Sequence, residues 1–318
     1  MKATTCFTAL VVATTATTVL MASPPGQTPA PAPQPQQPPA AVFRTGADVV
    51  TVDASVQRER RPVTGLAAAD FELLDNGVRQ DVTDVTYEKL PIDVTFVLDV
   101  SASVTGAALD ELRRALRQVR TDLTAADRLR LLAFNMRVRR LVDFTQPSAD
   151  VDLALGALRP GGSSAVFDAL AVALASADAP GRRRLIVLFS DGQDSSSISD
   201  ADALLEVAKR STPTIATILA SPLLERPASV LRTNTSLASA TIEGFSDRLA
   251  AETGGMVTSV KTGENLTSKF RRMVQDFRSS YVLFFTPNGV ERAGPHTLDV
   301  RVKRPGVEVR ARRGYVWR

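Results

Sequence analysis

The sequence predicts an α/β protein with a doubly wound, mostly parallel six-stranded sheet, joined to a small β-sandwich built from N- and C-terminal strands. Residues 91–280 alternate short apolar runs with segments of helical periodicity, which is typical of a mostly parallel sheet. Residues 41–90 and 281–318 show strand patterns and turn signals instead. The 318 residues are 44% hydrophobic and 23% charged, so the chain is an ordinary globular one with length for one large domain and a small one.

Apolar runs and helical patterns define the elements expected in the central domain. We expect strands at 93–99, 129–135, 138–144, 184–190, 214–220 and 256–260. A short turn joins the second and third of these, so 138–144 is expected to be an antiparallel edge strand. We expect helices at 105–122, 149–158, 165–178, 200–210, 245–253 and 263–279. In the first helix, apolar residues at helical spacing predict a core-facing stripe: Leu109, Leu112, Leu116 and Val119.

The two ends of the chain carry strand patterns. Residues 49–56 alternate apolar and polar side chains, and the turn signal at 75–77 predicts a hairpin. Further strands are expected near the C-terminus at 281–285, 297–303, 307–312 and 314–317. Neither end has enough strands for a core of its own. We therefore expect an N-terminal β module, 41–90, to pack with the C-terminal strands, 281–318, with the central domain inserted between them.

The first 40 residues are expected to lie outside the folded domains. Lys2 precedes an apolar stretch that ends in small residues near Ser23, which is typical of a secretory signal peptide over 1–23. Residues 24–40 form a Pro-rich linker. We therefore expect a secreted or periplasmic protein. Its mature chain would have no cysteine, hence no disulfide or thiol chemistry, and no segment apolar and long enough to cross a membrane.

Oxygen-bearing side chains follow two apolar runs of the central domain. The run 94–98 is followed by Asp99, Ser101 and Ser103, and the run 185–189 is followed by Ser190 and Asp191. A Gly-Gly-Ser-Ser turn at 161–164 lies between them in the sequence. In open α/β sheets ligands bind at the carboxyl ends of the strands. The two carboxylates, together with the hydroxyls of Ser101, Ser103 and one serine of this turn, form a hard-oxygen set without Cys or His that is suited to Mg²⁺ or Mn²⁺.

This order of motifs resembles the von Willebrand factor type A (vWA) family and its metal-ion-dependent adhesion site. The family pattern is D-x-S-x-S, then a Thr, then an Asp in a D-G turn. Asp99, Ser101 and Ser103 match the first element, and Asp191 matches the last. The Thr position falls on Ser164, or on the preceding Ser163 if the turn is shifted by one residue. The segment 63–71 resembles the small β module that precedes the vWA domain in secreted bacterial VWFA-related proteins.

The resemblance implies a Rossmann-like fold and a site for Mg²⁺, or for Mn²⁺ or Ca²⁺. Its ligands would be the following residues: Asp99, Ser101, Ser103, Ser164 and Asp191. It also implies a protein partner whose Asp or Glu completes the coordination. Ser163, Asp168 and Asp194 are candidate supporting groups, although Asp194 could instead cap the following helix or lie in a solvated loop. A different class is also open: a structural or assembly factor of the cell envelope that uses no metal.

Other function classes have little support in the sequence. We expect His296 in a surface turn, far in sequence from the serines above. No Walker, dinucleotide or HExxH motif is present in the sequence. We therefore expect that the protein is not an enzyme. The formal net charge of +4 comes from arginines interleaved with acids, and aromatics are few, so we expect no nucleic-acid partner. The long segment 221–244 is expected to form a loop that rims the metal and influences partner choice.

Overall fold

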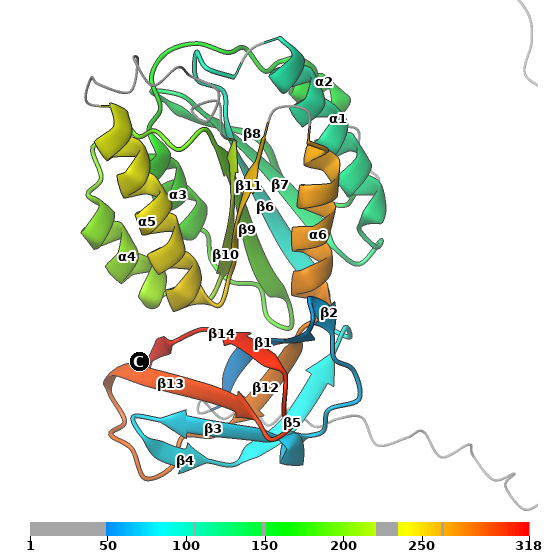
Figure 1. Cartoon of the computed structure of the whole chain (residues 1–318), viewed down its shortest axis with the longest axis vertical. Coiled ribbons are helices and arrows are strands. Elements are labelled where there is room, and N and C mark those ends of the chain that lie inside the picture. The colour runs from blue at the N-terminus through cyan, green and yellow to red at the C-terminus, as the bar shows by residue number, and fades with distance from the viewer. Residues whose placement is uncertain (1–48, 105, 148–150, 221–234, 262–263, 318) are drawn as a thin grey trace, which may run out of the picture. The chain divides into compact units, whose positions relative to one another are not determined.

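The computed structural model describes residues 49–104, 106–147, 151–220, 235–261 and 264–317 (Figure 1). The expected signal peptide, the Pro-rich linker and residues 221–234 of the expected long loop lie outside the described residues. No helix within the described ranges is long and apolar enough to cross a membrane.

A six-stranded mixed sheet forms the centre of the α/β part. Its strands are β6 (Ile92–Asp99), β7 (Arg128–Phe134), β8 (Val138–Thr145), β9 (Arg183–Ser190), β10 (Thr214–Ala220) and β11 (Val257–Val260). They lie in the order β11-β10-β9-β6-β7-β8. The β7–β8 pair is antiparallel and the other neighbouring pairs are parallel, so the predicted antiparallel edge strand is confirmed. Every residue of β6 and β9 is buried, as expected for strands covered on both faces.

Helices cover both faces of this sheet (Figure 1). They are α1 (Ala107–Asp122), α2 (Asp152–Gly156), α3 (Val166–Leu174), α4 (Ala201–Lys209), α5 (Thr235–Thr253) and α6 (Leu266–Arg278). Alternate residues of β6 point to opposite faces: Phe96 packs in a cluster with α1 and α6, and Val97 packs in a cluster with α3, α4 and α5. The predicted apolar stripe of the first helix is confirmed, because its four residues are buried in the first cluster.

Three helix predictions are wrong in extent, and one of them, the helix expected at 165–178, ends at Leu174. The helix expected at 245–253 begins ten residues earlier, at Thr235, so the expected loop 221–244 is helical from that point. The sequence there is rich in Ser, Thr and Ala and lacks a strong apolar period, which explains why periodicity did not predict this part of the helix. The helix expected at 149–158 is limited to Asp152–Gly156.

Two antiparallel sheets form from strands at both ends of the described chain, and we name them together the β module. One sheet has the order β14-β1-β12-β5, with β2 paired to β1, and the other has the order β15-β13-β3-β4. The strands are β1 (Val50–Arg58), β2 (Arg61–Pro62), β3 (Phe71–Asp75), β4 (Val78–Gln80), β5 (Val82–Tyr87), β12 (Tyr281–Phe285), β13 (Gly294–Val302), β14 (Glu308–Ala311) and β15 (Gly314–Trp317). Both sheets contribute to one buried apolar cluster. The domain boundaries given above stay a prediction.

The expectation that His296 lies in a surface turn is wrong. His296 lies in β13 and is 4% exposed. Its Nδ1 is 2.8 Å from the buried Asp75 carboxylate, and its ring stacks on Tyr315 at 4.6 Å between centroids. The Tyr315 hydroxyl donates to the other Asp75 oxygen at 2.8 Å, and burial together with this carboxylate raises the pKa of Tyr315. A buried carboxylate requires donors, so this histidine satisfies Asp75 within the β module.

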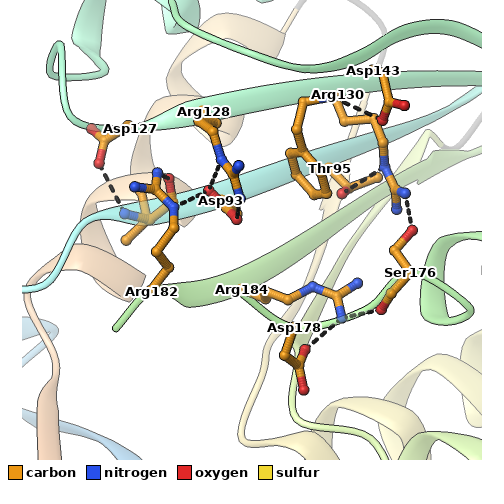
Figure 2. A network of polar contacts seen from close by, with 12 residues as sticks. Asp93, Thr95, Asp127, Arg128, Arg130, Asp143, Ser176, Asp178, Arg182 and Arg184 are labelled. Atoms are coloured by element: carbon orange, nitrogen blue, oxygen red, sulfur yellow. Dashed lines mark hydrogen bonds and ion pairs between the residues drawn. The ribbon is translucent and has the colours of Figure 1, made fainter. Parts of the chain in front are cut away.

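Arginines and aspartates form a polar network at the edge of the sheet where β6 and β9 begin (Figure 2). The Asp93 side chain is 1% exposed and accepts hydrogen bonds from Arg128 Nε at 2.9 Å and Arg182 Nε at 2.6 Å. Burial alone would raise the pKa of Asp93, but these charged donors outweigh it and the pKa is lowered. In the same network, Arg130 is buried and donates to the Ala173 carbonyl at 3.0 Å. Burial, assisted by the charge of Arg184, lowers the pKa of Arg130 to about 10.

Replacing Asp93 by Asn is expected to destabilise the protein by about 3 kcal/mol, because two arginines lose their buried counter-charge. Urea unfolding followed by circular dichroism measures the change. The control is Asp143→Asn, whose carboxylate pairs with Arg140 where both side chains are exposed (60% and 63%). That change should cost less than about 1 kcal/mol. Equal effects of the two substitutions would contradict a dominant role for the buried pair.

Candidate metal centre

The adjacent parallel strands β6 and β9 bring the predicted site residues to one edge of the sheet. Leu98 is paired with Phe189, so the next residues, Asp99 and Ser190, lie side by side where the strands end. The Ser190 hydroxyl donates to Asp99 Oδ2 at 2.9 Å. Asp191 follows directly, is 7% exposed, and its negative charge acts on Asp99. The two predicted carboxylates are therefore neighbours.

Asp99 is fully buried and receives hydrogen bonds from three segments of the chain. The Ser101 amide donates to Oδ1 at 2.9 Å, and the Ser164 hydroxyl lies 3.1 Å from Oδ2, which also accepts from Ser190. Burial raises the pKa of Asp99 to about 6, and the charge of Asp191 adds to this, although the hydrogen bonds from Ser101 and Ser190 act in the opposite direction. The carboxylate is thus well supplied with donors, and no Lys or Arg of the described residues forms an ion pair with it.

A glycine turn places Ser164 beside Asp99. The Gly161 amide donates to the Val100 carbonyl at 3.0 Å, and the Gly162 carbonyl accepts from the Ala102 amide at 3.0 Å. Gly162 has φ +79°, a conformation that favours glycine. These two bonds fasten the turn to the loop after β6, and Ser164, 3% exposed, is the residue that reaches the Asp99 carboxylate.

Ser101 and Ser103 extend the cluster toward solvent. Their hydroxyl oxygens are 2.9 Å apart; Ser101 is buried and Ser103 is exposed. The structure therefore brings together Asp99, Ser101, Ser103, Ser164 and Asp191, with Ser103 at the accessible end. Ser190, which is not one of the predicted ligands, belongs to the same group. Its position as the last residue of an apolar strand was the signal that could have identified it.

The three candidate supporting residues differ in position. Asp194 Oδ1 accepts from the Val166 amide at 2.6 Å, so it caps α3; the expected cap on the following helix is wrong, because Asp200 caps α4. Asp168 accepts from the amides of Ile198 at 3.0 Å and Ser199 at 2.8 Å, and so holds the loop after β9. Ser163 is half-buried, and among the described residues its hydroxyl makes no contact with Asp99 comparable to that of Ser164.

The loop after β9 is fastened to Ser164 as well. The Ser164 carbonyl accepts from the amides of Ser195 at 2.8 Å and Ser196 at 3.0 Å, and its own amide donates to the Ser195 hydroxyl at 3.2 Å. Three loops, those after β6 and β9 and the turn before α3, are thus held to one another by backbone bonds. The geometry of the hydroxyl and carboxylate oxygens is set by this frame.

The donor set fits a hard divalent cation. It consists of two adjacent carboxylates and several serine hydroxyls, which are oxygen ligands of the type that Mg²⁺, Mn²⁺ and Ca²⁺ bind. Within the described residues, no Lys or Arg side chain forms an ion pair with Asp99 or Asp191. Nor do those residues contain a group of three or more His, Cys, Asp or Glu side chains arranged for a metal. A metal at this site would therefore be bound mainly by serine hydroxyls, together with the two carboxylates.

The fold and this cluster define an α/β protein with an acidic, hydroxyl-rich site at the carboxyl edge of its sheet. Residues 93–269, more than half of the chain, match the family model of the von Willebrand factor type A domain. The chain belongs to the vWA family, and the predicted membership is confirmed. Domains of this family are generally interaction modules.

Several solved structures are similar to this chain. They include the conserved hypothetical protein BatB from Bacteroides thetaiotaomicron, at 16% identity and a TM-score of 0.45, with 58% of this chain and 98% of that chain covered. The vWF domain of the type V pili tip protein Mfa5 from Porphyromonas gingivalis is 16% identical, with a TM-score of 0.44 and coverages of 58% and 94%. A von Willebrand factor type A protein from Catenulispora acidiphila is 13% identical, with a TM-score of 0.47 and coverages of 86% and 75%. At these values the family assignment rests on the family model alone.

Replacing Asp99 by Asn is expected to change how the stability of the metal-free protein depends on pH. The native carboxyl has its pKa at about 6 and the unfolded one at 3.8, so the native state holds a proton that the unfolded state has lost between these values. Wild-type stability from this group is present at low pH and is lost as pH rises through about 6, by up to about 3 kcal/mol. Relative to wild type, the variant should therefore gain stability between pH 4 and 7.5.

Urea unfolding in EDTA at several pH values measures this difference. Asp143→Asn serves as the control, because its carboxylate is exposed and it should show no such change relative to wild type. A constant difference between Asp99→Asn and wild type over the whole range would contradict the raised pKa.

Proposed function

We propose that this chain binds a protein partner through a divalent cation, Mg²⁺ or alternatively Mn²⁺ or Ca²⁺, and that an Asp or Glu of the partner completes the coordination. The metal ligands would be Asp99, Ser101, Ser103, Ser164 and Asp191. The observation that carries the proposal is the buried Asp99 carboxylate, which lies beside Asp191 and among hydroxyls without a cationic side chain from the described residues. We also propose that the protein is secreted or periplasmic, on the pattern of residues 1–23.

Each residue type has a distinct task in this proposal. Asp99 and Asp191 supply the negative charge that attracts the cation, and their two charges balance a divalent ion. Ser101, Ser103 and Ser164 supply neutral oxygens, which bind without reducing the charge further. A bound cation supplies Lewis acidity toward an incoming carboxylate. Because Ser103 is exposed, the partner would approach from its side of the cluster.

Binding is favoured over catalysis by what surrounds the cluster. The histidine of the chain, His296, is buried in the β module, where Asp75 holds its Nδ1. Asp168 accepts from backbone amides of the loop after β9, and Asp194 accepts from the Val166 amide of α3 and from the Ser197 hydroxyl at 2.6 Å. Neither aspartate is a free base beside the hydroxyls. With a cation bound, the site would therefore offer electrostatic attraction for a carboxylate, and among the described residues neither His296 nor these two aspartates is positioned as a base beside the hydroxyls.

Mg²⁺ or Mn²⁺ is expected to raise the melting temperature of the wild-type protein above its value in EDTA. A ligand of the native state at 100 times its Kd stabilises by about 2.7 kcal/mol. Asp99→Ala should abolish the increase, because it removes the central carboxylate. Differential scanning fluorimetry in EDTA, MgCl₂ and MnCl₂ measures the effect. An absence of any increase at millimolar metal would favour the alternative, a metal-independent structural or assembly factor of the cell envelope.

The metal-induced increase in melting temperature also shows which serine of the glycine turn, Ser163 or Ser164, is the third hydroxyl ligand. Ser164→Ala is expected to lose most of the metal-induced increase, since Ser164 contacts Asp99 at 3.1 Å. Ser163→Ala should keep it, because that side chain is only half-buried and belongs to the same turn without this contact. If Ser163→Ala loses the increase and Ser164→Ala keeps it, the third hydroxyl ligand is Ser163.

A further inference from the structure

Two large apolar side chains are exposed at the edge of the sheet that carries the proposed metal site. Met136, in the turn between β7 and β8, is 59% exposed, and Ile198, in the loop after β9, is 96% exposed. In the sheet, β6 lies between β9 and β7. The loop with Ser101 and Ser103 therefore has Ile198 on the loop at one side and Met136 on the turn at the other. A single exposed apolar residue is ordinary, but these two lie on the connections at either side of the loop that carries Ser101 and Ser103.

Met136 is close to the hydroxyl cluster. Its sulfur lies 3.4 Å from the position that a Cβ on Gly162 would occupy. The Gly162 carbonyl in turn accepts from the amide of Ala102, the residue between Ser101 and Ser103. The turn that carries Met136 is fixed, because Asn135 Nδ2 donates to the Gly161 carbonyl at 2.7 Å. Met136 thus presents an apolar surface beside the glycine turn, from a well-supported backbone.

Ile198 is presented in a similar way from the other side. Its amide donates to Asp168 at 3.0 Å, and the same loop is held to Ser164 through the amides of Ser195 and Ser196. The backbone is therefore anchored while the side chain has almost no contact within the protein. An apolar group on an anchored backbone can be covered by a partner with little loss of conformational entropy.

Arg137 adds a positive charge at the Met136 side of the proposed site. With a divalent cation bound, the charges of Asp99 and Asp191 are balanced. Arg137, next to Met136, is exposed, and within the described part of the chain its guanidinium forms no ion pair. Its backbone amide donates to Asn135 Oδ1 at 3.1 Å, which fixes its place in the turn. A positive charge beside the site attracts an acidic segment and repels a basic one.

We infer that the partner segment carries its metal-binding Asp or Glu between two apolar side chains, one of which packs on Met136 and the other on Ile198. The inference rests on the proposed function, since the acidic residue needs the cation. The occupant is an acidic peptide segment of a protein, with the pattern apolar, acidic, apolar. Covering the two side chains adds hydrophobic stabilisation to the single coordination bond and thereby gives sequence preference to a site whose oxygen ligands alone would accept any carboxylate.

A displayed peptide library tests this inference on the full chain. Each peptide has a central Asp or Glu with randomised residues on both sides, and selection is carried out in MgCl₂ and, in parallel, in EDTA. We expect enrichment in MgCl₂ only, with Leu, Ile, Val, Met or Phe next to the acidic residue on both sides. Mg²⁺-dependent enrichment of acidic peptides without apolar neighbours would overturn the inference and leave the proposed function standing. Absence of any Mg²⁺-dependent enrichment would overturn both.

Substitutions then locate the contacts. For the enriched peptide, Met136→Ser and Ile198→Ser are each expected to raise the Kd about tenfold, as loss of one buried apolar side chain does. The matched control is Val207→Ser, because Val207 is 48% exposed on α4 and should leave the Kd unchanged. Fluorescence polarisation with the labelled peptide in MgCl₂ gives the values. Kd values within twofold of wild type for both Met136→Ser and Ile198→Ser would overturn the assignment of the contacts, even if the peptide binds.

Discussion

The Asp99 carboxylate, buried where the central strand β6 ends, is the constraint on which the carboxyl edge of the sheet depends. A carboxylate removed from water requires donors or a counter-charge. The donors come from three segments: the Ser101 amide, the Ser164 hydroxyl and the Ser190 hydroxyl. Backbone hydrogen bonds between the loops hold each segment in place, so that its donor reaches the Asp99 carboxylate. The frame of loop-to-loop backbone bonds is thus what allows this one charge to be buried.

The pKa values of two buried aspartates at opposite edges of the sheet are shifted in opposite directions. Asp93 lies near the edge where β6 begins. It accepts hydrogen bonds from Arg128 and Arg182, and these donors lower its pKa despite burial. Asp99, six residues later on the same strand, has hydroxyl and amide donors and Asp191 as a neighbour, and its pKa is raised to about 6. The first carboxylate is satisfied by the protein itself. The Asp99 carboxylate forms no ion pair with the described residues. For this reason a cation is the ligand in the proposed function.

Local sequence patterns predicted the parts of the structure that local forces determine. Apolar runs followed by Asp99 or Asp191 fixed the strands and the edge to which these side chains belong, because parallel neighbours end together. Two side-chain contacts between distant residues had no local signal in the sequence and were not predicted. His296 is buried because Asp75, 221 residues away, requires a donor. Asp194 caps α3, a helix that precedes it in the sequence, and that pairing depends on how the loop after β9 folds back.

The pairing of β5 with β12 explains how the β module accommodates the long intervening segment. Tyr87, the last residue of β5, is paired with Tyr281, the first residue of β12. The chain therefore leaves the β module and returns to it at neighbouring positions of one antiparallel pair. Within the intervening segment, β6 begins at Ile92 and α6 ends at Arg278, so only a few residues connect it on each side. Because its two ends are held together by strand pairing, the α/β part acts as a folded loop of a β hairpin, and its own folding offsets the entropy cost of closing that loop.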